Sequence, residues 1–327
     1  MRVKVRDILK KVVIKIIVGI PRGLMFCKYY PFIQVFLKAL DVQIITSEET
    51  NKKILDLGIK YCVDDACFPV KIFHGHVGSI KDQCDLIIIP RIMKMKDGKC
   101  PCPNFGGLPE MIYNNIPNMP KMISKPIYLN SDKKIWKWVK ELGKELGKNH
   151  KEITRAYIEA KKAGDNHLTG IKNDGYKMNV LLLGHVYNLY DSFSNMNIVK
   201  KLNKLGVGVV TEEFLDDNEK EKYADNLFKR PFWYIVKDTF GASMDVYNNK
   251  TVDGIIYLSS FACNVDSVVA ELIRGNIENF PLLVLKLDEQ TGDAGLNTRI
   301  EAFVDMIERK CEVESNFSTL RQHTYCS

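Results

Sequence analysis

The stretch CDLIIIPRI, residues 84–92, decides the fold class of this chain. At its centre, Leu86 to Ile89 form an unbroken apolar run, which Pro90 and Arg91 close. A short run that is apolar on both faces and ends at a proline is typical of a strand in a parallel sheet covered on both sides. We therefore predict a buried strand here and search on either side of it for neighbouring strands.

Short apolar runs alternate with helical patterns through the first part of the chain. Strands are predicted near residues 14–20 (in VVIKIIVGIP), at VQIITS (42–47) and at KMISKPIYL (121–129). Helical spacing is found in YYPFIQVFLKAL (29–40) and across 50–80, where it is interrupted near Cys67. This β-α-β-α-β order predicts a parallel sheet with helices on both faces.

The alternation restarts after two helical patterns within residues 131–167, the first with an N-cap candidate at Ser131 or Asp132. The later strands are predicted in KMNVLLLGHVYNLYD (177–191), VGVVTEEF (207–214), VDGIIYLSSFACNVD (252–266) and FPLLVLKLDE (280–289). The later helices are predicted in NIVKKLNKLG (197–206), VVAELIRGNI (268–277) and NTRIEAFVDMIERK (297–310). We expect an N-terminal α/β domain at 1–130, a helical linker at 131–167, and a C-terminal α/β domain at 168–327 that ends in a loose polar tail.

The composition is that of a globular protein, with 46% hydrophobic and 27% charged residues. The net charge of +7 is spread thinly and has no interleaved aromatic residues, which argues against a nucleic-acid partner. Lys15 interrupts the apolar run near the N-terminus, so this run is too short for a signal peptide or a membrane-spanning helix. We expect a cytoplasmic protein that does not contact a membrane.

The nine cysteines are odd in number and irregular in spacing, which favours reduced thiols or metal ligands over a disulfide framework. They are Cys27, Cys62, Cys67, Cys84, Cys100, Cys102, Cys263, Cys311 and Cys326. Three of them stand in predicted loops: VDDACFPVK with Cys67, CPCPNFGGLP with Cys102, and LSSFACNVDS with Cys263. Ligands bind at the carboxyl ends of parallel strands, and iron–sulfur clusters take thiolates, so these loops form a candidate cluster site. Buried small thiols and a zinc site are the alternatives, although a single C-P-C pair is poor zinc spacing.

Other polar positions give weaker signals. His74 and His76 have the wrong spacing for one helix face, and we expect them to be packed or capping side chains. His185 follows a predicted strand and either lines a binding site or forms a structural turn. The loop within LKLDEQTGDAGLNTRIEAF (285–303) either binds an anion at a helix N-terminus or is simply a tight capped loop.

Several of these runs together resemble one family. The runs are VGIPRGLMFCKYYPF, TNKKILDLGIKYCVDDACFPVKIFHGHV, IIIPRIM, CPNFGGLPEM, FACNVDS and LDEQTGDAGLNTRIEAFVDM. They resemble acyl-CoA dehydratase activase-related proteins, which belong with the 2-hydroxyacyl-CoA dehydratase subunits and the double-cubane-cluster reductases. The resemblance covers nearly all of residues 14–310, in order. It implies two Rossmann-like, doubly wound domains with a 4Fe–4S cluster in the cleft between them.

The resemblance also implies the ligands of that cluster. Matched residue by residue, they are Cys67, Cys102 and Cys263, with Cys100 as a neighbour. The chain departs from the family pattern in two places. Asn264-Val265 replaces the usual Gly-Pro after the third cysteine, and Gln290 stands where the family has a histidine.

The function implied by the resemblance is low-potential electron transfer, or reductive or dehydratase chemistry, assisted by a separate ATP-hydrolysing activator protein. An acyl-CoA substrate and a homo- or heterodimer are both compatible with it. Two alternatives remain open. One is a non-catalytic scaffold or regulatory subunit, and the other is a nucleotide-binding protein, although the chain has neither a P-loop nor a dinucleotide glycine motif.

Overall fold

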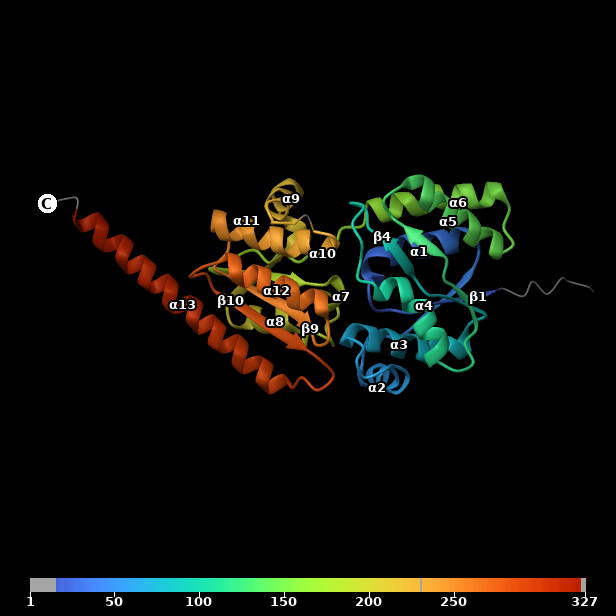
Figure 1. Cartoon of the computed structure of the whole chain (residues 1–327), viewed down its shortest axis with the longest axis horizontal. Helices are drawn as coiled ribbons and strands as arrows, with labels where there is room; N and C mark the ends of the chain where they lie inside the picture. Colours follow the sequence, from blue (N-terminus) through green and yellow to red (C-terminus); the bar gives the residue numbers. More distant parts are fainter. Residues whose placement is uncertain (1–15, 230, 325–327) are drawn as a thin grey trace, which may run out of the picture.

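The computed structural model of the chain describes residues 16–229 and 231–324 and contains two main parallel sheets of four strands each (Figure 1). The first sheet has the order β2-β1-β3-β5, with β1 at Ile17–Ile20, β2 at Gln43–Thr46, β3 at Leu86–Ile88 and β5 at Lys121–Ile123. The second has the order β10-β9-β7-β8, with β7 at Met178–Gly184, β8 at Val207–Thr211, β9 at Gly254–Ser260 and β10 at Leu282–Leu287. The predicted α/β class with parallel sheets is confirmed.

Both sheets have the same topology. When the strands of each sheet are counted along the chain, their spatial order is 2-1-3-4 in both cases. In this order strand 2 lies on one side of strand 1, and strands 3 and 4 lie on the other. The strand order therefore reverses between strands 1 and 3, and ligands bind outside the carboxyl ends of the strands at that point. The pairs β1/β3 and β7/β9 therefore mark where a site is expected.

Helices cover both faces of each sheet. Those of the first part are α1 (Phe26–Ala39), α2 (Lys52–Tyr61), α3 (Phe68–Ile80), α4 (Asn104–Asn115), α5 (Asp132–Glu145) and α6 (His150–Asp165). Those of the second are α7 (Val186–Leu189), α8 (Ile198–Lys204), α9 (Asp217–Asp225), α10 (Tyr234–Val236), a π-helix (Lys237–Gly241), α11 (Ala242–Asn249), α12 (Asn264–Asn276) and α13 (Asp293–Thr324). Short 3₁₀ turns occupy Lys81–Gln83 and Glu212–Phe214.

The central strand β3 shows why its sequence is apolar throughout. Leu86 and Ile88 pack in one cluster, which contains side chains of α1, α5 and α6. Ile87 and Ile89 pack in another cluster, which contains side chains of α3 and α4. Successive side chains of a strand point to opposite faces, so a strand between two helical layers must be apolar at every position.

Two predicted strands are broken at prolines. The stretch 121–129, predicted as one strand, forms β5 and then β6 (Pro126–Tyr128). Likewise the chain leaves β3 at Pro90 and enters β4 (Arg91–Lys94), which pairs with β6 in a separate two-stranded parallel sheet. Proline lacks the N–H that a central strand needs, so β3 ends before Pro90, whereas Pro126 stands at the first position of β6 in the two-stranded sheet.

The helices expected to form a linker pack on the first sheet. Trp138 and Val139 of α5 and Ile153 of α6 share one cluster with Val18 of β1. Figure 1 shows α5 and α6 beside α1, with the second sheet and its helices next to the first along the long axis. The division of the chain into separate domains stays a prediction.

The C-terminal stretch is polar, and a helix takes in its described residues. The backbone of α13 is helical to Thr324, and the helix runs along the second sheet and beyond it (Figure 1). No glycine or proline follows Gly295, so nothing in the sequence breaks the helix. The expected first strand begins at Ile17, and residues 14 and 15 lie outside the described residues. In the residues that the structure describes, no helix is both long and apolar enough to span a bilayer.

Candidate functional site

Cys263 lies at the N-terminus of α12, just beyond β9. It is the N-cap residue, and its Sγ accepts a hydrogen bond from the backbone N–H of Asp266 at 3.5 Å. The preceding residue, Ala262, has a left-handed backbone with φ +62°. This turn brings the thiol back over the end of the sheet, where it is buried.

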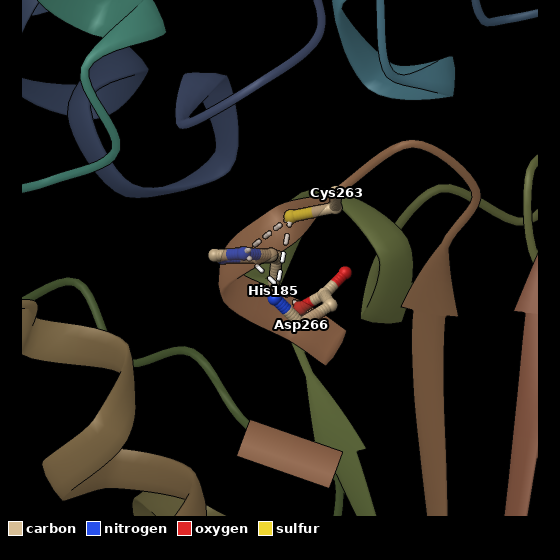
Figure 2. Close-up of side chains that lie close together, drawn as sticks. All are labelled: His185, Cys263 and Asp266. Atoms are coloured by element: carbon tan, nitrogen blue, oxygen red, sulfur yellow. Dashed lines mark hydrogen bonds and ion pairs between the residues drawn. The ribbon is translucent and has the colours of Figure 1, made fainter. Parts of the chain in front are cut away.

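His185 approaches the same thiol from the adjacent strand, β7. It is the N-cap residue of α7, and its ring is almost fully buried. Its Nε2 lies 3.3 Å from Oδ1 of Asp266 and 4.0 Å from Sγ of Cys263. Figure 2 shows the imidazole, thiol and carboxylate pointing toward one another. The three residues therefore meet at the β7/β9 position that the sheet order marks.

Asp266 is a buried carboxylate with four interactions in this site. It accepts hydrogen bonds from Tyr257 Oη at 2.7 Å and from the Ser260 backbone N–H at 2.8 Å, and it pairs with His185. Its backbone N–H binds Cys263. Loss of its carboxylate would leave buried donors without partners, which makes Asp266 the centre of the local network.

Burial shifts the pKa values of Cys263 and His185. It raises the pKa of the Cys263 thiol, and the negative charge of Asp266 raises it further. Burial lowers the pKa of His185, and Asp266 opposes that shift. Within the described residues, His185 Nδ1 is buried without a hydrogen-bond partner. The ring of Tyr187 stacks on this imidazole at a centroid distance of 4.7 Å.

Cys67 and Cys102 also stand at the starts of helices. Cys67 is the N-cap residue of α3, and a proline occupies the first turn of that helix. The carbonyl of Cys102 accepts a hydrogen bond from the N–H of Phe105 in the first turn of α4. All three predicted ligands therefore lie at the positive end of a helix dipole, which favours a thiolate.

The three thiols influence one another electrostatically. Burial raises the pKa of Cys67 to about 12, and ionised Cys102 and Asp266 add to that shift. Burial also raises the pKa of Cys102, with a further contribution from Asp266. The charges of Cys67 and Cys102 both act on Cys263. Cys67 and Cys263 thus resist ionisation while Cys102 is charged, unless a cation compensates the charges.

The cysteines expected to be bystanders have partners of other kinds. Lys94 Nζ donates to Cys100 Sγ at 3.1 Å, and the Cys100 backbone pairs with Trp233. Cys84 donates to the carbonyl of Ile80 at 3.4 Å, and burial raises the pKa of both Cys84 and Cys62 to about 11. The charge of Cys62 also acts on Cys67, whereas neither Cys84 nor Cys100 is found to act on any of the three predicted ligands in the described residues.

One group in the described part of the chain brings three or more His, Cys, Asp or Glu ligand atoms within 4.8 Å of one another. It consists of His185, Cys263 and Asp266. Sequence reasoning singled out Cys263 as a ligand and left His185 open, but it missed Asp266. A Cys-x-x-Asp spacing at the start of a helix could have pointed to Asp266, because the third residue of a helix lies next to the N-cap residue.

The remaining candidates are structural. His74 is buried, and its Nδ1 bonds the carbonyl of Val70 at 2.8 Å, while His76 bonds two hydroxyls. In the loop of residues 285–303, Asp288 accepts bonds from the Thr291 hydroxyl and the Gln290 N–H. The tight-loop interpretation is thus favoured there. Gln290 occupies the family's histidine position, so no titratable ring stands at this point.

Two cavities lie near the strand ends. The larger, about 530 Å³, is lined mainly by apolar side chains from the exits of both sheets, among them Met25, Pro90 and Val186. Its lining also includes charged residues, among them Glu212, Lys220 and Asp238. Burial, with help from Glu212, raises the pKa of Asp238 to about 7. The smaller cavity, about 180 Å³, is lined by Arg22, Tyr187 and other residues described below.

Two family models match the chain. The model described as the CoA enzyme activase uncharacterised domain matches residues 17–215. The model of the 2-hydroxyglutaryl-CoA dehydratase D-component matches residues 147–307. No curated protein matches the chain. The first match spans more than half of the 327 residues, and the resemblance noted in the sequence is confirmed, so the chain belongs to the CoA-enzyme activase and 2-hydroxyacyl-CoA dehydratase family.

Proposed function

We propose that this protein carries a 4Fe–4S cluster on Cys67, Cys102 and Cys263 and works in low-potential electron transfer or dehydratase-type chemistry. The observation that carries this proposal is the placement of all three thiols at helix N-termini, within electrostatic reach of one another. Thiolates whose charges oppose one another need a cationic partner, and iron supplies one.

The residues present fit such a group. Helix N-termini and the N–H of Asp266 stabilise sulfur charge, and hydrogen bonds to sulfur and burial are known to tune cluster potentials. When bound, a cluster with three thiolate ligands supplies an iron with an open position and one-electron chemistry. His185 would stand beside the Cys263 ligand, with its ring fixed by Asp266.

The partners proposed for this function are an ATP-hydrolysing activator protein and an acyl-CoA substrate. The 530 Å³ cavity, whose lining is mainly apolar but includes charged residues such as Lys220 and Asp238, is compatible with an acyl group. We further propose two Rossmann-like domains with the cluster in a cleft between them, a cytoplasmic location, and a homo- or heterodimer.

The test is anaerobic reconstitution of single cysteine variants. Cys67→Ala and Cys102→Ala should abolish cluster incorporation, because each removes one of three protein ligands. Cys263→Ala should give an intermediate result, since its flanking sequence departs from the family pattern. Iron and sulfide per chain and the visible absorbance of each variant are the measurements.

Cys62→Ala, Cys84→Ala and Cys100→Ala are the matched controls and should keep their iron. Cys100 is the most demanding of these because it lies two residues from Cys102 and its thiol is already bound by Lys94. If Cys100→Ala loses iron and Cys102→Ala keeps it, the ligand in this loop is wrongly assigned. If no variant changes the iron content, the cluster proposal fails and the scaffold interpretation replaces it.

The compact group at His185 supports a second candidate, a single metal ion bound by His185, Cys263 and Asp266. Nitrogen, sulfur and carboxylate ligands in one group suit zinc or iron. This candidate predicts a different variant pattern. The unaltered protein would hold one metal ion per chain and no labile sulfide. Cys263→Ala and His185→Ala would lose that ion, whereas Cys67→Ala and Cys102→Ala would keep it.

A further inference from the structure

The smaller cavity lies where the exit of β1 meets the segment after α7. It has a volume of about 180 Å³, and its polar lining includes Arg22, Thr50, Asp191 and Ser194. Typical pockets for drug-sized ligands measure about 300–1,000 Å³, so this cavity suits a smaller molecule. Tyr187 also lines it, and the ring of this residue stacks on His185.

Arg22 is the positively charged side chain in the lining of this cavity, and not all of its N–H groups have a hydrogen-bond partner. Its Nε is buried and has no hydrogen-bond partner among the described residues. Its Nη1 lies 3.7 Å from Glu49, a carboxylate that is 87% exposed, so this ion pair is loose and hydrated. The guanidinium lies over the ring of Phe26 at 5.6 Å, which fixes its plane.

The second acid of the cavity, Asp191, is turned into the protein and does not neutralise Arg22. Its Oδ1 accepts the backbone N–H groups of Phe193 at 3.0 Å and Ser194 at 3.1 Å. Its Oδ2 accepts the hydroxyl of Thr50. Both oxygens are thus bonded to donors other than Arg22, and the described residues show no ion pair between Asp191 and the guanidinium.

A hydrogen-bonded chain behind Asp191 keeps this arrangement in one orientation. Since the Thr50 hydroxyl donates to Asp191, it accepts from Nε2–H of His76 at 3.0 Å. Nδ1 of His76 is then unprotonated and accepts from Ser47, 2.9 Å away, whose oxygen accepts the backbone N–H of Arg22 at 2.9 Å. The network thus starts and ends at the cavity wall and holds Arg22 in place.

Ser194 supplies a second donor. The residue is almost fully buried and lines the cavity, and its backbone N–H donates to Asp191. We propose that this cavity is a binding site for the carboxylate or phosphate group of a small anionic ligand, held by Arg22 and Ser194. An oxyanion accepts from a guanidinium in two parallel bonds, and this pairing satisfies the orphan Nε. The site does not require the proposed cluster.

Calorimetric titration of the iron-free protein with inorganic phosphate and with propionate tests the site. At least one of these anions should bind the unaltered chain, and the one that binds identifies the oxyanion class. Arg22→Gln should weaken that binding at least tenfold. Arg155→Gln, which removes the same charge from exposed helix α6, is the matched control and should bind like the unaltered protein.

Absence of binding by both anions, or equal binding by Arg22→Gln, overturns the proposal. If Arg22→Gln does not fold, modification of Arg22 by phenylglyoxal in the unaltered chain gives the answer instead. A saturating anion should protect Arg22 several-fold, as measured by peptide mass spectrometry, and lack of protection counts against the site. Iron incorporation is measured separately, so failure here leaves the cluster proposal untouched, and the reverse also holds.

Discussion

The two residues that follow Cys263 differ from the family pattern, and the structure shows what this difference changes. Asn264 and Val265 are the first residues of α12, where the family has Gly-Pro. Proline is favoured at the first positions of a helix because its N–H is not needed there, but other residues start a helix equally well. The unusual backbone lies on the other side of the thiol, at Ala262. The departure therefore leaves Cys263 as the helix N-cap.

Sequence reasoning reached the thiols because cysteine beside proline and glycine is conspicuous. It did not reach Asp266, whose role depends on contacts with Tyr257 and Ser260, and it left His185 undecided. The contacts of Asp266 arise from the turn between β9 and α12, whereas His185 comes close because β7 and β9 are neighbours in the sheet. One sequence without its strand order does not specify them, since the strands are 70 residues apart in the chain.

A pH prediction follows from His76, which is fully buried. Burial, aided by the charge of Arg22, lowers its pKa to about 3, whereas an unfolded histidine titrates near 6.5. Between these values the unfolded chain binds a proton that the folded chain does not, so stability falls as the pH falls. From pH 7 to pH 5, His76 should account for a loss of about 2 kcal/mol in the free energy of unfolding.

The measurement is urea unfolding of the unaltered chain and of His76→Gln at both pH values. Glutamine offers a donor and an acceptor to the two hydroxyls but takes up no proton. The variant should lose less stability between pH 7 and pH 5 than the unaltered chain does. His74 and His185, whose pKa values burial also lowers, contribute equally to both proteins. Equal losses in the two proteins would contradict the assignment.

At the scale of elements, the packing of α2 on α3 positions Cys67. The two helices cross at glycines: a Cβ on Gly58 would lie 2.1 Å from the carbonyl oxygen of Lys71, and one on Gly75 would lie 1.9 Å from that of Ile54. Both obstructions are backbone atoms, which cannot rotate away. Since α3 begins directly after Cys67, the separation of these helices sets the position of that thiol.

Gly58→Ala should therefore destabilise the protein by at least about 2 kcal/mol, because the added methyl group forces the helices apart. The variant should also incorporate less iron if Cys67 is a ligand. Gly107→Ala is the matched control. It lies in α4 with no atom within 4 Å of its Cβ position, so the change should stabilise by about 0.5–1 kcal/mol. Thermal unfolding and iron content measure both effects, and an unchanged stability of Gly58→Ala would refute the close-contact argument.

The helices of residues 216–249, which sequence reasoning missed, share a physical cause. Residues 216–249, for which no helix was predicted, form α9, α10, the π-helix and α11. Charged residues dominate α9, and aromatic residues precede α10, so neither segment has a clear apolar period. Their helices are stabilised by burial of Lys220 against Glu212 and of Phe240 in the core. Such tertiary contacts cannot be read from local spacing.

At the scale of the whole molecule, the core is shared by both sheets. One cluster contains Ile87 and Phe73 from the first part of the chain and Leu181 and Tyr257 from the second. Side-chain pairs also join the two parts, among them Lys28 with Glu213 at 3.0 Å. The sequence predicted two similar α/β halves, but alternation within each half carries no information about contacts between them.

Among the described residues, Lys71 and Glu289 make the most buried ion pair between these parts of the chain, with Nζ 2.5 Å from Oε1. The pair joins α3 to the loop after β10, across 218 positions of sequence. The lysine side chain is 7% exposed and the glutamate 23%, so loss of either partner has unequal consequences. Removal of the glutamate leaves a buried ammonium without compensation, whereas removal of the lysine leaves a carboxylate that water can reach.

We therefore expect Glu289→Ala to destabilise the protein by about 2–3 kcal/mol and Lys71→Met by less than about 1 kcal/mol, measured by urea unfolding. The double variant should be close to Lys71→Met, because methionine needs no counter-ion. Lys52→Met, on the exposed face of α2, is the control for loss of a lysine charge and should change little. If the two single variants are equally destabilised, the pair acts as an ordinary surface salt bridge, and α3 is held against the second sheet by apolar packing alone.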